Sequence, residues 1–228
     1  MPRYAVPVVS SLVVLAVLSG CGGGDKVSSS SLAPRLLPAS AIPGFVQERT
    51  FDWSDPVNLV GEGIAIPQNT RPSDALKKFQ KSHLEGAAGE VLRRGAGLGA
   101  TEVVVGVAKF KSDDDATTVK TWMHNQDLQQ PCFSECAFAP RQTTVPGAPG
   151  MQFVVQTAPA VVRPLPGVKT KGPPKFAHAP PEAANYLAEF TSGPYLYWAD
   201  LRGSDVSAKR QVEAGLKAYY DHAKREPS

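Results

Sequence analysis

A valine-rich segment joined to a strong helix start constrains the fold most. Thr101 to Phe110 contains four valines and no proline, a composition typical of a well-buried strand. Ser112 follows, and then come three consecutive aspartates at 113–115. A serine hydroxyl at the N-cap and carboxylates at the positive end of the helix dipole predict a helix that runs to about Gln129. Capping explains these aspartates better than a calcium loop, since the alternating ligands and distal glutamate of such a loop are missing.

The same order of elements recurs near the C-terminus. Segments 185–190 and 195–201 alternate apolar and polar residues and predict an antiparallel pair, and Ser204-Asp205 then begins a helix that runs to about Lys224. A further hairpin is expected from segments 137–145 and 151–157. We therefore predict an α+β fold, an antiparallel sheet with helices packed on one face. The repeated order also allows two related strand-helix halves.

The elements before residue 101 are less sharply marked. Short strands are expected at 45–51 and 57–66, separated by a turn around Pro56. A helix that begins near Pro72 continues through apolar residues at helical spacing to about Leu92, unless Gly86 and Gly89 break it. In the proline-punctuated segment before these elements, the apolar pair Leu36 and Leu37 is expected to dock on the domain.

An apolar run at the N-terminus sets the domain organisation. It spans Ala5 to Leu18, 14 residues, which suits the h-region of a signal peptide and is too short to cross a bilayer of about 30 Å. Glycines at 22–24 and serines at 28–31 suggest a flexible spacer. We expect a signal peptide at 1–20, a flexible tether at 21–34 and a single extracytoplasmic domain at 35–228.

The residues Leu18-Ser19-Gly20-Cys21 resemble the lipobox of a bacterial lipoprotein signal peptide. The resemblance implies cleavage before Cys21, a diacylglycerol thioether on its sulfur, and a further acyl chain such as palmitate on its amine. A thiolate is the nucleophile that such alkylation needs. Two or more acyl chains anchor a protein stably. The expected location is the extracytoplasmic face of the cell membrane.

With Cys21 used for lipid attachment, Cys132 and Cys136 remain. An even number of cysteines in an exported chain favours a disulfide, here one that pins a local turn. Free thiols are the main alternative. A metal site with His124 is disfavoured, because two sulfurs and one remote histidine fall short of four ligands.

Charge and motifs exclude several classes of function. The formal net charge is +3, which gives no global attraction to nucleic acid. The chain lacks the common catalytic motifs in a convincing context, and its four histidines, at 83, 124, 178 and 222, are scattered. The glycine-rich segment 95–100 matches a dinucleotide pattern, but it is expected to follow a helix and precede a strand, the reverse of a Rossmann turn. No cofactor, no metal and no catalytic residue are predicted, and enzymatic activity is disfavoured.

Two groups of residues are candidates for binding. A proline-rich loop between Thr157 and Pro181 has no acidic residue and four basic ones that could contact anionic headgroups or polymers: Arg163, Lys169, Lys171 and Lys175. A solvated surface loop is the alternative. Five aromatic residues on the late strands could line a pocket for a lipid or glycan: Tyr186, Phe190, Tyr195, Tyr197 and Trp198. Core packing between strands is the alternative for these.

Three packing motifs carry a further resemblance: the segment Leu37 to Gly44, the strand-to-helix join Val107 to Ser112, and the strands near Tyr186 and Tyr197. They resemble motifs of a loose group of actinobacterial lipoproteins. By analogy the domain is similar to Mog1/PsbP-like or cystatin-like α+β folds. The resemblance implies a binding or accessory module of the cell envelope whose partner is an envelope protein, a lipid or an anionic polymer. The alternatives are a cell-envelope enzyme, and a sensor or scaffold subunit of an envelope complex.

Overall fold

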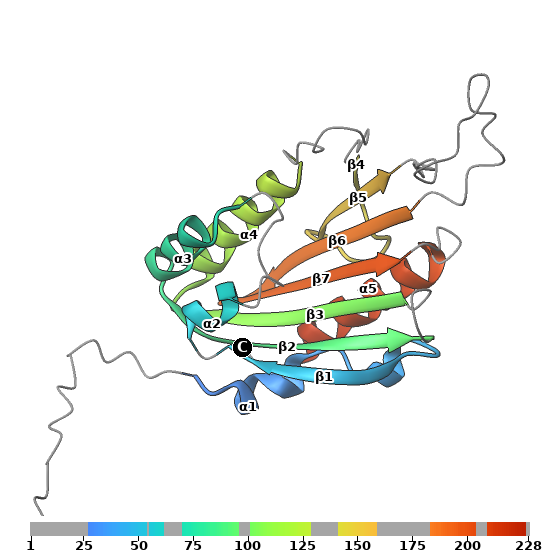
Figure 1. The fold of residues 1–228 in the computed structure, drawn as a ribbon, viewed down its shortest axis with the longest axis horizontal. Coiled ribbons are helices and arrows are strands. Elements are labelled where there is room, and N and C mark those ends of the chain that lie inside the picture. The colour runs from blue at the N-terminus through green and yellow to red at the C-terminus, as the bar shows by residue number, and fades with distance from the viewer. Residues whose placement is uncertain are drawn as a thin grey trace, which may run out of the picture.

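The computed structural model describes residues 27–53, 55–61, 70–95, 101–128, 141–158, 183–203 and 209–226. Their strands form one antiparallel sheet of seven strands in the order β1-β2-β3-β7-β6-β5-β4 (Figure 1). The strands are β1 (Val46–Asp52), β2 (Leu84–Arg94), β3 (Thr101–Phe110), β4 (Arg141–Thr143), β5 (Gln152–Ala158), β6 (Ala183–Ser192) and β7 (Tyr195–Gly203). The helices are α1 (Ser29–Leu32), α2 (Pro56–Gly61), α3 (Pro72–Lys81), α4 (Asp113–Leu128) and α5 (Lys209–Arg225), with 3₁₀ turns η1 (Ala33–Arg35) and η2 (Ala39–Ala41).

This architecture confirms the α+β class and the antiparallel sheet. The valine-rich strand β3 lies near its middle, between β2 and β7. The two expected pairs, β4 with β5 and β6 with β7, are present. The cap of α4 is also confirmed, because the amide nitrogen of Asp115 donates a hydrogen bond of 3.2 Å to Oγ of Ser112.

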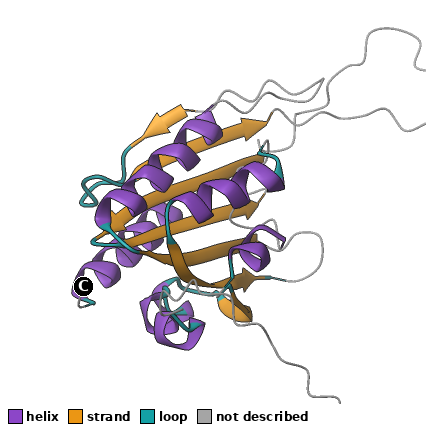
Figure 2. Ribbon diagram, turned by 90° about the vertical axis from the view of Figure 1, so that its left-hand side faces the viewer, coloured by secondary structure: helices purple, strands orange, loops and turns teal. Residues whose placement is uncertain are grey.

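Helices cover both faces of the sheet, whereas the sequence predicted helices on one face. Figure 1 shows α5 passing behind the strands, and Figure 2 shows the strands as one sheet flanked by helices. We call the two sides the α4 face, which packs against α2, α3 and α4, and the α5 face, which packs against α5 and the N-terminal turns. The reason lies in the central strands: Tyr197 of β7 points to the α5 face and its neighbour Trp198 to the α4 face. A sheet that is apolar on both faces has to be covered on both.

The expected relation between two strand-helix halves is not found. Strands β3 and β7 are antiparallel neighbours, so a twofold axis perpendicular to the sheet would superpose them. That rotation would leave α4 and α5 on the same face, but they pack on opposite faces. The similar order of elements therefore has no counterpart in the arrangement of the helices.

Two elements before residue 101 differ from expectation. Residues 56–61, expected to begin a strand, form α2, whose first turn is capped by a 2.8 Å hydrogen bond from the Val57 amide to Oδ1 of Asp55. The expected long helix ends at Lys81, and residues 84–94 form β2 instead. The chain turns at His83, which has a φ of 50°, a left-handed conformation that a continuing helix does not tolerate. The apolar spacing in β2 reflects burial on both faces and not a helical stripe.

The N-terminal turns belong to the folded domain. Leu36 and Leu37 pack into the core on the α5 face, as expected. Leu32 lies within the segment expected to be a flexible tether, yet its side chain is 1% exposed in the same core. The packing of the described chain therefore begins at Val27. Residues 27–34, which belong to the segment expected to be a tether, lie against the domain. Within the described ranges, no helix has the length and apolar composition needed to cross a membrane.

Candidate functional site

Four ionisable side chains lie buried between α4 and the sheet. His124 and Asp127 come from the C-terminal half of α4, Glu189 from β6 and Asp200 from β7, and none is more than 6% exposed. Burying charged groups costs free energy unless they are paired or neutralised. Such groups are concentrated at functional sites. We call these four residues the acid–base cluster.

Local structure explains how each residue reaches the cluster. The buried stripe of α4 runs through Ala116, Val119 and Met123, and Asp127 continues it at helical spacing. Glu189 stands directly opposite Trp198 across the β6–β7 pair, and Asp200 is two residues further along β7, so both face α4. Helix and strand periodicity together therefore bring the cluster under the end of α4.

The cluster combines the imidazole of His124 with carboxyl groups from α4 and the sheet. Nδ1 of His124 lies 3.7 Å from Oε2 of Glu189, beyond hydrogen-bonding distance. Asp127 of α4 and Glu189 of β6 are close enough for each to change the pKa of the other.

Burial is the largest influence on the pKa of His124, Asp127 and Glu189. Burial, together with the charge of Glu189, raises the pKa of Asp127 to about 10. Burial also raises the pKa of Glu189, to about 7, against the opposing effects of the hydrogen bond to Asp127 and the charge of Lys120. Burial lowers the pKa of His124, an effect that Gln142 and Asp127 offset only in part, so the imidazole is neutral at neutral pH.

Polar atoms without a hydrogen-bond partner gather around the cluster. They are both ring nitrogens of His124, Oε2 of Glu189, Oε1 of Gln152 and Nε1 of Trp198. Gln152 and Trp198 flank Glu189 on the neighbouring strands. Buried polar atoms in proteins normally bond to protein or to ordered water. Among the residues described, no three histidine, cysteine, aspartate or glutamate side chains are arranged to hold a metal ion.

The sequence did not identify this cluster. In the sequence His124 is one of four scattered histidines, but its side chain is only 4% exposed. Glu189 and Asp200 occupy the polar positions of alternating strands, which would face solvent if only one face of the sheet were covered. The one available signal was the helical spacing from Met123 to Asp127, which places an acid on the apolar stripe of α4.

Four of the five predicted aromatic residues do lie together. Tyr186, Phe190, Tyr195 and Tyr197 belong to the core on the α5 face, whereas Trp198 points to the α4 face. The rings of Phe190 and Tyr197 are stacked with centroids 4.9 Å apart, and Tyr219 of α5 meets both edge-on. Only Tyr186 of this set lines a cavity of about 20 Å³ beneath α5, which has room for about one water molecule.

A larger hollow lies at the β1 edge of the sheet. This groove of about 220 Å³ runs between the N-terminal turns and strands β1 and β2. Its lining combines hydroxyl groups and one carboxyl group with apolar side chains of several sizes: Ser29, Ser30, Ala33, Leu36, Thr50, Phe51, Asp52, Ala88 and Gly89. The groove lies beside the point where the described chain begins.

The remaining predicted site residues lie outside the described residues. These are Cys21, the pair Cys132 and Cys136, and the four basic residues of the proline-rich loop, Arg163, Lys169, Lys171 and Lys175. The lipid attachment, the disulfide and the anionic-partner loop stay predictions.

Comparison with solved structures shows a likeness of fold. The extracellular domain of PknH from Mycobacterium tuberculosis matches with a TM-score of 0.52 and 14% sequence identity, over 90% of this chain and 100% of that chain. At this identity the likeness concerns the fold alone. Comparison with protein-family models and with curated proteins gives no match.

Proposed function

We propose that the chain is a lipid-anchored, extracytoplasmic binding or accessory module of the cell envelope. The observation that carries the proposal is the sequence Leu18 to Cys21, at the end of an apolar run and shortly before an ordered domain. The fold likeness to an extracellular domain supports the extracytoplasmic location. The groove of about 220 Å³ at the β1 edge supports a role in binding.

The short connection between anchor and domain limits what the module can reach. If Cys21 carries the lipid, five residues separate it from Val27, whose amide donates a hydrogen bond of 3.1 Å to the Glu85 carbonyl at the start of β2. The six residue-to-residue steps from Cys21 to Val27 span at most about 20 Å. The N-terminal turns, β1 and the adjacent groove would therefore lie close to the membrane surface.

Replacing Cys21 with serine tests the anchor. Serine lacks the thiolate that the lipid transfer needs, so we expect the variant to lose a metabolic acyl label and to leave the membrane fraction. The measurement is cell fractionation together with label incorporation. Cys136→Ser is the matched control and should keep both label and membrane association. A Cys21→Ser protein that still sediments with membranes and carries the label contradicts the proposal.

A further inference from the structure

Strand β1 forms one edge of the sheet, and its side chains are exposed. In the described part of the chain β1 pairs only with β2 (Figure 1). Residues 46–50 and 52 are exposed and Phe51 is half-buried. Among the described residues Val46, at 65%, is the most exposed large hydrophobic side chain. An edge of this kind offers backbone N–H and C=O groups to another strand.

A β-bulge makes this edge selective. The pairing of β1 with β2 shifts between Gln47 and Arg49, so Glu48 is an extra residue. Such a bulge bends an edge strand and discourages pairing with a regular strand. A second copy of β1 carries the same bulge at the same position, so the irregularity of one strand matches that of the other. The edge therefore favours a second copy of this chain over an unrelated strand.

The bulge also decides which side chains of β1 share a face. Phe51 stands opposite Gly89 and stacks on Trp53, which belongs to the core on the α4 face. The guanidinium of Arg49 lies 4.8 Å from the ring centroid of Phe51. Arg93, four residues from Gly89 along β2, points to the same face; it stands opposite Val46 and forms an ion pair of 2.9 Å with Glu48. Four side chains therefore share the α4 face: Val46, Glu48, Arg49 and Phe51.

The other two side chains in this stretch point the opposite way. Gln47 stands opposite Leu92, which belongs to the core on the α5 face, and its Nε2 donates a hydrogen bond of 2.6 Å to Glu90. Thr50 stands opposite Glu90 and lines the groove beside the N-terminal turns. Gln47 and Thr50 therefore share the α5 face.

One antiparallel register of two β1 strands pairs complementary side chains. A twofold axis between Glu48 and Arg49 sets each Glu48 opposite Arg49 of the second copy. Val46 then stands opposite Phe51, and Gln47 opposite Thr50, and the members of each pair share a face of the sheet. A shift of one residue in either direction would set Arg49 against Arg49 or Glu48 against Glu48, and like charges directly opposite destabilise a strand pair.

The charges already present on the sheet continue across this register. On the α4 face Arg93 of β2 lies between Glu102 of β3 and Glu48 of β1, at 4.0 Å and 2.9 Å, so the row alternates in sign. Among the described residues Arg49 has no acidic partner. The side chain of Glu48 is 40% exposed and remains accessible to a second cation. Arg49 of a second copy is the next charge that this row requires.

We propose that the chain forms a symmetric dimer through antiparallel pairing of β1 with β1 of a second copy. The twofold axis lies between Glu48 and Arg49, and it joins two seven-stranded sheets into one continuous sheet. The axis is perpendicular to the sheet, so the N-terminal turns of both copies lie on the same side of the joined sheet. Both copies can then be anchored in one membrane, although the pairing does not depend on the anchor.

The experiment uses two differently tagged copies of the full chain, expressed together and solubilised in mild detergent. Purification through one tag should recover the second copy. Arg49→Glu in both copies sets two acids against each other at both contacts beside the axis, and we expect recovery to fall roughly tenfold. Glu48→Arg in both copies should do the same with two arginines. Lys77→Glu in both copies, at an exposed position of α3, is the matched control and should leave recovery unchanged.

The decisive sample combines the two variants. When one copy carries Arg49→Glu and the other Glu48→Arg, every contact beside the axis again joins an acid to a base. Recovery should return to the parental level, although neither variant associates with itself. Failure of this mixed pair to associate overturns the proposal. So does equal recovery for the parent and both variants, because the copies would then associate elsewhere or only share a micelle.

A cross-link tests the register without altering the charges. One copy carries Gln47→Cys and the other Thr50→Cys, and oxidation should form a disulfide between positions 47 and 50 of different copies, located by mass spectrometry. A copy with Gln47→Cys alone should form no disulfide from position 47 to position 47. Absence of the link between positions 47 and 50 contradicts the proposal, also where a charge variant fails to fold. Loss of membrane association in Cys21→Ser leaves these outcomes unchanged, so the anchor and the dimer are tested separately.

Discussion

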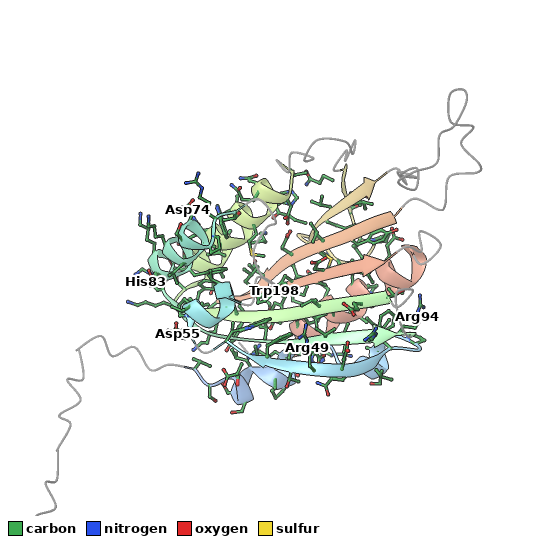
Figure 3. The ribbon with its side chains drawn as sticks, in the orientation of Figure 1. Arg49, Asp55, Asp74, His83, Arg94 and Trp198 are labelled. Carbon is green, nitrogen blue, oxygen red and sulfur yellow. The ribbon has the colours of Figure 1, made fainter. Side chains whose placement is uncertain are left out.

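A pair of glycines shows how single residues shape the α4 face. Gly89 of β2 stands opposite Gly106 of β3, and the indole rings of Trp53 and Trp198 lie over them. The two rings are stacked with centroids 5.9 Å apart, and Phe51 extends the stack toward the β1 edge. Figure 3 shows Trp198 over the middle of the sheet. Glycine normally weakens a strand, but here the missing side chains make room for the aromatic layer.

Gly106→Ala should be strongly destabilising. An added Cβ would lie 2.1 Å from Cζ2 of Trp198, a distance that requires the ring to move. Overpacking of this kind costs about 1–3 kcal/mol in the free energy of unfolding, measurable by chemical denaturation. In a Trp198→Leu background the same substitution should cost much less, since the obstructing ring is gone. An equal cost in both backgrounds would show that the indole is not the cause.

At the scale of elements, the N-terminal turns act as part of the core. The guanidinium of Arg35 lies 3.7 Å from the ring centroid of Tyr195, and its Nη1 donates a 3.2 Å hydrogen bond to the hydroxyl of Tyr197. Nε2 of His222 in α5 donates to the carbonyl oxygen of Pro34 over 2.8 Å. These contacts join the turns to β7 and α5, so the segment folds with the domain.

Leu32→Ala tests whether the N-terminal turns are part of the core. The side chain is buried in the core of the α5 face, and truncating a buried leucine costs about 2–5 kcal/mol. We expect a single cooperative denaturation with a lower midpoint. Val46→Ala, at a position 65% exposed on β1, should change the midpoint little. An unchanged midpoint for Leu32→Ala would mean that the segment is a tether after all.

At the scale of the whole molecule, the two-faced sheet determines where polar groups end up. Helices on both sides leave few solvent-facing positions on the central strands, so polar residues such as Glu189 and Asp200 become internal. In the described part of the chain, β1 is the strand whose residues are mostly exposed. Interactions through the sheet are therefore expected at this edge.

The basic loop predicts binding to anionic membranes. A Cys21→Ser chain should bind vesicles that contain anionic lipid, and replacing Arg163, Lys169, Lys171 and Lys175 with glutamine should weaken binding. Each basic residue near the surface contributes about 1 kcal/mol, or roughly fivefold in affinity, at low salt. The control carries the same change of charge at four exposed lysines of the folded domain: Lys77, Lys81, Lys111 and Lys224. Cosedimentation measures both, and an equal loss would point to overall charge and not to the loop.

The elements that the sequence predicted well are those with strong local signals. The valine-rich strand β3, the serine cap of α4, the late strands and the terminal helix all depend on neighbours within a few residues. The helix expected across residues 84–92 was wrong because β2 is apolar on both faces, which periodicity alone does not distinguish from a helix. Of the candidate site, only Asp127 had any sequence signal.

By itself the sequence determined the antiparallel α+β class and the order of its later elements, because both rest on local propensity. The anchor at Cys21 stays a prediction from a short motif. Only the tertiary structure decided that α4 and α5 cover opposite faces of the sheet. That choice depends on contacts between residues far apart in the chain. It buries Glu189 and Asp200 on the face of the sheet that α4 covers, and it brings Asp127 close to them.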